Sequence, residues 1–476
     1  MNHLKLGNLF CARGVFALAF FYSLSAGLLI QLVMLPFVMP ALDAGHGLLK
    51  GGDWIGFHQE AVQLANRIHH EGWAVWELRP QGNAPIGIAA AAYVLTGISE
   101  PWILMPLNAG LFAVGATCLY MMFSLLAPHR LAFAATMPYV LFPSAAVIYG
   151  QIHKDVWSIA GMTLIALVWV RIAAYSKLNW KDTGIQAMLT LTGVLFVWLV
   201  RPYMVQVLLV ASILIVFAIA FWLFTGSDKN KFTIHGLIRM ALPLIFLIVF
   251  VKFPLGTSAQ EMVLSKEKEL VTQEMVLSKE KGLVTQEMVL SKEKGPVTWQ
   301  LIWQRAQLIP AFADNLLSKF VSKLAEDRQG FTKGYPGAGS NIDTEDEFHS
   351  ASDVGRYIPR ALQIALFAPF PNMWWESGSS PGAGHMRLVS GIEMAFTYLL
   401  MPGVVLLFLC RGFHGPITVI LIQAIVPAII LALVVSNVGT LYRMRFVNLQ
   451  MLNGLGMIGW VTWLQYWNTK YRRIQD

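Results

Sequence analysis

The sequence is poor in charge and in cysteine. Only 13% of its 476 residues are Asp, Glu, Lys or Arg, about half the share in soluble globular proteins. The three cysteines, Cys11, Cys118 and Cys410, have neither a metal-ligand spacing nor the pattern of a disulfide framework. A glycine motif of the Walker or dinucleotide type is also missing. These absences argue against a soluble enzyme, a zinc protein and a disulfide-rich secreted domain.

Apolar residues dominate instead, at 56% of the chain. A helix needs about 20 apolar residues to cross the hydrocarbon core of a membrane. We therefore predict an all-α polytopic membrane protein with about ten transmembrane helices plus interfacial helices. The first apolar run is too long for a cleavable signal peptide. The predicted spans are 14–40, 102–127, 131–149, 156–174, 185–200, 203–225, 236–253, 389–410, 415–436 and 446–467.

The net charge of +8 is attributed to the orientation of the chain in the membrane rather than to nucleic-acid binding, because the basic residues lie in short loops between apolar runs. Two short apolar stretches, 85–98 and 361–375, are predicted to lie at the interface instead of crossing. With that choice every short loop on the side of the N-terminus is basic, as cytoplasmic loops are. Both termini are then cytoplasmic, and two large loops, 41–101 and 254–388, lie outside.

The chain divides accordingly into three parts. Residues 1–253 form an N-terminal transmembrane module, 254–388 a large outer loop, and 389–476 the C-terminal transmembrane helices. The outer loop carries three near-identical 13-residue copies within 260–298, which begin at Gln260, Gln273 and Gln286. A binding array is one interpretation of these copies. We favour a tolerated insertion at a loop tip.

Charged residues beside the predicted outer ends of spans mark a candidate site. Asp53 follows the first span and precedes an amphipathic helix, roughly 57–71, with Ala61, Leu64, Ala65 and Ile68 on one face. Asp155 begins a later span directly after His153 and Lys154. Either carboxylate is also an ordinary residue for the start of a helix.

Three arginines, Arg201, Arg443 and Arg445, lie in predicted outer turns, against the trend of basic residues inside. Lipid phosphate is one anionic partner for them. A phosphate substrate is the other, because the planar guanidinium suits phosphate oxygens. The acidic residues of the second outer loop, such as Asp343 and Asp346, are typical of a solvated loop or of a divalent-cation site.

The order of these features resembles the GT-C superfamily of membrane glycosyltransferases, chiefly over residues 14–205. Asp53 in GGDW corresponds to the early acidic residue of the superfamily's first outer loop. Asp155 in HKDVW, after the run from Pro143 to Tyr149, corresponds to a second acidic position. The first loop lacks the Asp-Glu pair of the mannosyltransferases, and the C-terminal half consists of spans. Bacterial members of surface-polysaccharide assembly are the most similar.

The resemblance implies transfer of a sugar from a polyprenyl-phosphate donor to a glycan, lipid or protein acceptor. Asp53 would be the general base, and Asp155 would orient the acceptor or a cation. Lys154, Arg201, Arg443 and Arg445 would bind the donor phosphate. The chemistry allows a divalent cation, Mg²⁺ or Mn²⁺, without requiring one. The expected location is a bacterial inner membrane, with the site facing the periplasm or exterior, and nucleic acid is not an expected partner.

Two other functions stay open. A flippase or transporter for lipid-linked sugars needs polar groups inside the spans near the midplane, whereas here the charges gather at the predicted outer ends. A polysaccharide polymerase shares the substrates and the large outer loops, and only Asp53 argues against it.

Overall fold

The structure is a computed structural model. It describes residues 10–175, 180–225, 234–252, 318–334, 338–376, 382–412 and 415–475. The 13-residue copies at 260–298 lie outside these ranges, so their predicted role as an insertion stays a prediction.

Throughout the described residues the elements are helices, and none is a strand. The long helices are α1 (Ala12–Leu29), α4 (Met105–Ser124), α7 (Asp155–Ala174), α8 (Trp180–Val200), α9 (Pro202–Thr225), α10 (Ile234–Lys252), α14 (Ala383–Arg411), α15 (Gly415–Val434) and α17 (Phe446–Gln475). The shorter ones are α2 (Trp54–Glu71), α3 (Ala84–Thr96), α5 (His129–Leu141), α6 (Ala145–Tyr149), α13 (Ala351–Phe367) and α16 (Val438–Met444). The predicted all-α class is confirmed.

By length and composition, seven helices of the described ranges could cross a membrane. They are Ala12–Val38, Pro101–Ser124, Asp155–Ala174, Trp180–Val200, Pro202–Trp222, Gly384–Arg411 and Gly415–Val434. The protein is thus a multi-pass membrane protein, but the predicted count of about ten is not confirmed.

The three remaining predicted spans correspond to α5, α10 and α17. The predicted span 131–149 is divided, because α5 ends at Leu141 and α6 begins only after Pro143. Proline lacks the amide hydrogen that a continuing helix needs. α17 is long enough to cross, but it carries Asn448, Gln450 and Asn453 among its apolar residues.

Close contacts between small residues hold the bundle together. A Cβ atom added to Gly403 of α14 would collide with the backbone carbonyl of Gly456 in α17, and one added to Gly161 of α7 with that of Gly193 in α8. Without side chains at these positions, the helix backbones approach closely, as is common among membrane helices.

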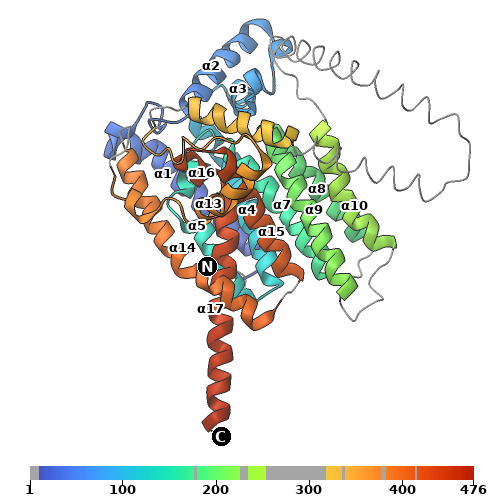
Figure 1. Ribbon diagram of the computed structural model, residues 1–476. Coiled ribbons are helices and arrows are strands. Elements are labelled where there is room, and N and C mark those ends of the chain that lie inside the picture. Colours follow the sequence, from blue (N-terminus) through green and yellow to red (C-terminus); the bar gives the residue numbers. More distant parts are fainter. Residues whose placement is uncertain are drawn as a thin grey trace, which may run out of the picture.

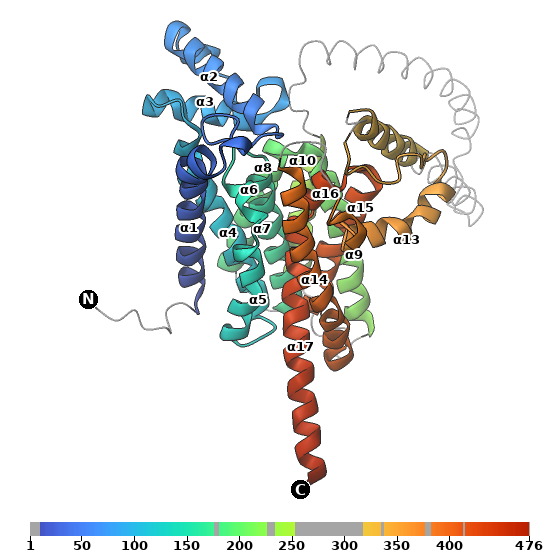
Figure 2. The same ribbon diagram turned by 90° about the vertical axis from the view of Figure 1, so that its left-hand side faces the viewer.

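The described parts of the segments predicted as outer loops lie toward one end of the bundle. α2, α3 and α13 are found there, and the last turns of α17 extend from the opposite end (Figures 1 and 2). α2 is amphipathic as predicted, since Ala61, Leu64, Ala65 and Ile68 are all buried. They pack with Ile86, Ala89, Ala90 and Tyr93 of α3. The side of the membrane that this end faces stays a prediction.

Candidate phosphate-binding site

The turn between α6 and α7 carries the centre of the site, and buried amide side chains fix its backbone. Asn108 of α4 donates hydrogen bonds to the carbonyls of Tyr149 (3.1 Å) and Gln151 (3.0 Å). Gln31 donates to the carbonyl of Gly150 (2.7 Å). These bonds satisfy carbonyl groups that a buried turn would otherwise leave unpaired, and they set the chain that continues to His153, Lys154 and Asp155.

Asp155, the first residue of α7, is 2% exposed. Arg201, between α8 and α9, donates a hydrogen bond to its carboxylate Oδ1. Arg201 also donates to the hydroxyl of Tyr203 (2.9 Å). Burial lowers the pKa of Arg201, but Asp155, Tyr203 and Asp53 together outweigh it and raise that pKa above the usual value. Arg201 is therefore a permanent cation at this end of the bundle.

His153 joins Asp155 to Arg443 of α16. Its Nε2 lies 2.7 Å from Nη1 of Arg443, and since a guanidinium only donates, this nitrogen is the acceptor. The backbone N–H of Asp155 donates a hydrogen bond to Nδ1 of the same ring (3.1 Å), and Oδ2 of Asp155 lies 3.0 Å from that nitrogen. Burial lowers the pKa of His153, in keeping with a neutral ring.

The start of α2 covers these residues with aromatic rings. The Arg443 guanidinium carbon lies 5.8 Å from the ring centroid of Trp54, and the Lys154 ammonium lies 5.3 Å from that of Phe57. Both are cation–π distances. Burial, and next the charge of Arg201, lower the pKa of Lys154. We call Lys154, Arg201 and Arg443, with His153 and Asp155, the basic cluster.

Asp53 lies beside the basic cluster. It precedes α2, is exposed, and its carboxylate makes no capping hydrogen bond to the described residues. Its charge favours the protonated forms of Lys154 and Arg201, against the effect of burial on both. The geometry thus does not support the interpretation of this side chain as a helix cap.

A further cation, Arg79, was not identified from the sequence. It lies in the chain after α2, and its charge lowers the pKa of Lys154, after burial and Arg201. Its Nη2 donates to the carbonyl of Gly82 (2.9 Å), and among the described residues its buried Nε has no hydrogen-bond partner. With Arg79 included, four cations face the carboxylates of Asp53 and Asp155. This surplus of positive charge can attract an anion.

Arg445 does not belong to this cluster, contrary to the prediction. Its side chain is completely buried, and it donates hydrogen bonds to the carbonyls of Ile364, Ala365 and Ala368. These carbonyls lie at the C-terminal end of α13, where the last turn of a helix leaves its carbonyls unpaired. Arg445 therefore closes the end of α13 and is no phosphate ligand.

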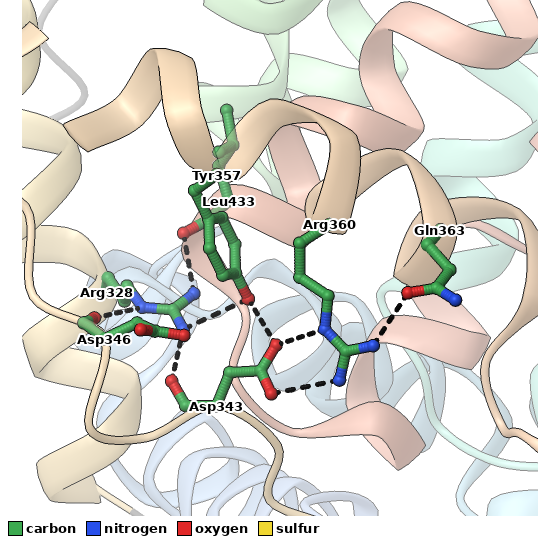
Figure 3. Close-up of polar contacts among 7 residues, drawn as sticks. All are labelled: Arg328, Asp343, Asp346, Tyr357, Arg360, Gln363 and Leu433. Carbon is green, nitrogen blue, oxygen red and sulfur yellow. Dashed lines mark hydrogen bonds and ion pairs between the residues drawn. The ribbon is translucent and has the colours of Figure 1, made fainter. Parts of the chain in front are cut away.

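A second polar cluster lies in the predicted second outer loop (Figure 3). Arg360 of α13 binds Asp343 through two hydrogen bonds of 2.8 and 3.1 Å, and Tyr357 donates to the same carboxylate (2.9 Å). Arg328 donates to the carbonyls of Asp346 and Leu433 (3.0 and 3.1 Å). We call Arg328, Asp343, Tyr357 and Arg360 the Asp343 network. Its carboxylate is fully engaged with protein donors, which argues against a cation ligand.

The part of the chain that the structure describes contains no group of three or more His, Cys, Asp or Glu side chains that could hold a metal ion. The dependence on a divalent cation, allowed by the sequence, stays untested.

Polar side chains are also buried within the bundle, which the sequence argument against a transporter did not anticipate. They include Glu393 of α14, Gln423 of α15, and Asn448, Gln450 and Asn453 of α17. Single polar residues in long apolar runs were the available signal, and Glu393 is the one acidic residue among those named here.

Comparison of the sequence with protein families and with curated proteins gives no match. Among solved structures, the chain is similar to the archaeal oligosaccharyltransferase AglB from Archaeoglobus fulgidus, determined in complex with an inhibitory peptide and a dolichol-phosphate. The TM-score is 0.46 and the identity 14%, over 94% of this chain and 50% of that one. The chain thus spans half the length of that protein. The residues of the basic cluster, not this likeness, carry the proposal below.

Proposed function

We propose that the protein is a membrane glycosyltransferase that transfers a sugar from a polyprenyl-phosphate donor to a hydroxyl of a glycan, lipid or protein acceptor. The observation that carries the proposal is the surplus of cations beside an exposed carboxylate, at one end of a membrane bundle. Lys154, Arg201 and Arg443 are the phosphate ligands. Asp53 is the base.

The reaction is a single displacement at the anomeric carbon. The acceptor oxygen forms the new bond while its proton passes to the Asp53 carboxylate. The bond from the anomeric carbon to the phosphate oxygen breaks, and the polyprenyl phosphate leaves with the electron pair. Its developing charge is stabilised by the arginine and lysine side chains, and a single displacement inverts the anomeric configuration.

Asp155 has a different role from Asp53 in this proposal. It is buried, it accepts a hydrogen bond from Arg201, and its Oδ2 lies 3.0 Å from Nδ1 of His153. Its function is to hold these two side chains, and through His153 also Arg443, in one arrangement around the phosphate. An acceptor hydroxyl is expected to approach from the side of Asp53, which is open to solvent.

The decisive experiment supplies purified protein in nanodiscs with polyprenyl-phosphate-linked sugars and an acceptor fraction, both extracted from the source membranes, and measures release of free polyprenyl phosphate. Release by the parent but not by the Asp53→Asn variant supports the proposal. Lipid-linked sugars that accumulate in cells lacking the protein would identify the donor, whose sugar and prenyl length the site does not specify. We expect the site to face the periplasm of a bacterial inner membrane.

The buried polar groups of α15 and α17 favour one second candidate, a flippase. Among the described residues, Nε2 of Gln423 and Oδ1 of Asn448 and Asn453 are buried without hydrogen-bond partners. Movement of the intact lipid-linked sugar across the bilayer, without release of polyprenyl phosphate, would establish that function and refute the transferase.

A further inference from the structure

Glu393 is a buried carboxylate in an otherwise apolar helix, and the proposed reaction does not use it. Only 3% of the residue is exposed, and within the described chain it forms no ion pair. Its Oε1 accepts a hydrogen bond from the backbone nitrogen of Ser144 (2.7 Å), and its Oε2 accepts one from the hydroxyl of Tyr442 (2.5 Å). An ionisable group within a membrane span is expensive to bury, so it usually has a function.

Tyr442 is the residue directly before Arg443 in the short helix α16. The start of α16 is fixed by hydrogen bonds from Val438 nitrogen to the carbonyl of Ser340 (2.9 Å) and from Asn437 to the side chain of Asn341 (3.1 Å). Its end is fixed by Arg445, which closes α13. Between these two anchors, the hydrogen bond from Tyr442 to Glu393 holds the residue next to Arg443.

The second hydrogen bond of Glu393 reaches the other half of the basic cluster. Ser144 begins the chain that runs through α6 to the turn with His153 and Asp155. One carboxylate therefore contacts both of the segments that meet where Arg443 donates to His153. Because both bonds are buried, they are strong relative to bonds exposed to water.

We infer that Glu393 is a positioning residue, which acts through Tyr442 to hold Arg443 against His153 and so shapes the phosphate site. That this arrangement serves a phosphate site rests on the proposed function. The arrangement itself is testable without any activity. A merely structural role for Glu393 would affect the stability of the protein but not the freedom of the Arg443 side chain.

The test measures how fast phenylglyoxal modifies Arg443, followed by mass spectrometry on the full chain in nanodiscs. Tyr442→Phe removes the donor hydroxyl and keeps the ring. Glu393→Gln removes the charge at nearly constant shape. Tyr398→Phe is the matched control, because the Tyr398 hydroxyl, also on α14, donates only to the backbone carbonyls of Phe367 and Pro369.

We expect phenylglyoxal to modify Arg443 about fivefold faster in Tyr442→Phe and in Glu393→Gln than in the parent. This factor is equivalent to about 1 kcal/mol, the contribution of one lost hydrogen bond. Tyr398→Phe should match the parent. An unchanged rate in Tyr442→Phe, or an equal increase in Tyr398→Phe, overturns the inference. If Glu393→Gln does not fold, Tyr442→Phe alone decides.

A second arm adds farnesyl phosphate as a probe, and this arm tests the proposed function separately. Protection of Arg443 in the parent supports a phosphate site at this residue. If the probe gives no protection while Tyr442→Phe still speeds modification, the positioning role stands and the phosphate site is refuted.

Discussion

The basic cluster and the Asp343 network contain similar residues and use them differently. In the network, Asp343 accepts two hydrogen bonds from Arg360. Arg328 donates to the backbone carbonyls of Asp346 and Leu433. In the basic cluster, Lys154 contacts a ring, and within the described structure the buried Nε of Arg201 has no hydrogen-bond partner. Arginines with complete partners stabilise a fold, whereas surplus cations and unused donors suit an incoming anion.

The contrast divides the effects of substitution. Changes in the network should alter stability and leave the reaction alone. Changes in the basic cluster should alter the reaction, and at exposed positions they should do so with little change of stability.

The largest effect is expected for Asp53→Asn. Loss of a general base typically slows a reaction on the order of a hundredfold or more, and we expect such a loss of transfer. Because the Asp53 side chain caps no described backbone group, the thermal unfolding midpoint should be unchanged. Transfer rate and midpoint are measured on the same preparation. Transfer within a few-fold of the parent would remove Asp53 from the site.

Arg443→Ala should have the next largest effect. A hydrogen bond to a charged group contributes about 1.5–3 kcal/mol, so the affinity for the donor should fall by roughly ten- to a hundredfold. Arg443→Lys should recover only part of this, since lysine lacks the planar fork. The matched control is Arg360→Ala in the Asp343 network. Equal losses of donor affinity in both alanine variants would abolish the distinction between the two clusters.

The rate of transfer is expected to depend on pH through His153. It should fall by about tenfold per pH unit once the ring protonates. The protonated ring carries an N–H on both nitrogens, so Nε2 can no longer accept the hydrogen bond of Arg443. Since burial lowers the pKa of His153, transfer should be constant at neutral pH and fall only below about pH 6.5, the ordinary histidine value.

Stability should follow the same direction. Below about pH 6.5 the unfolded chain binds a proton that the folded site resists, so folding stability decreases as the pH falls toward the lowered pKa. His153→Gln, which does not titrate, should have a flat profile over this range. An acidic limb that persists in this variant would assign the titration to another group.

The sequence was sufficient for the class of fold and for most of the cluster. Apolar runs predicted the helices, and the 3–4 residue spacing of Ala61, Leu64, Ala65 and Ile68 predicted the buried face of α2, which the structure confirms. Asp53, Lys154, Asp155, Arg201 and Arg443 were selected as charges at the ends of spans, and the structure brings them to one end of the bundle. Their roles in catalysis stay predictions.

The errors have physical reasons. Arg443 and Arg445 are two residues apart, which on a helix is a rotation of about 200°, so the two side chains leave in nearly opposite directions. Only one of them can reach His153, and sequence proximity does not say which. The charge of Arg79 acts on Lys154, and Glu393 accepts a hydrogen bond from Tyr442. Both partners are distant in the sequence, so the pattern of neighbouring residues carried no information about either contact.

The smallest effect is expected for Tyr357→Phe in the Asp343 network. The variant loses one hydrogen bond to Asp343, worth about 1 kcal/mol, and the thermal midpoint should fall by roughly 2 °C or less.

Partial burial raises the pKa of Asp343, but the hydrogen bonds from Arg360 and Tyr357 outweigh it and leave the pKa below its usual value. The stabilisation is therefore complete above about pH 4, the ordinary value for aspartate, and is lost as the pH falls through the lowered pKa. Transfer and donor affinity should equal those of the parent at neutral pH. A Tyr357→Phe variant with normal stability and weakened donor binding would place the Asp343 network in the reaction, and the comparison between the two clusters would have to be given up.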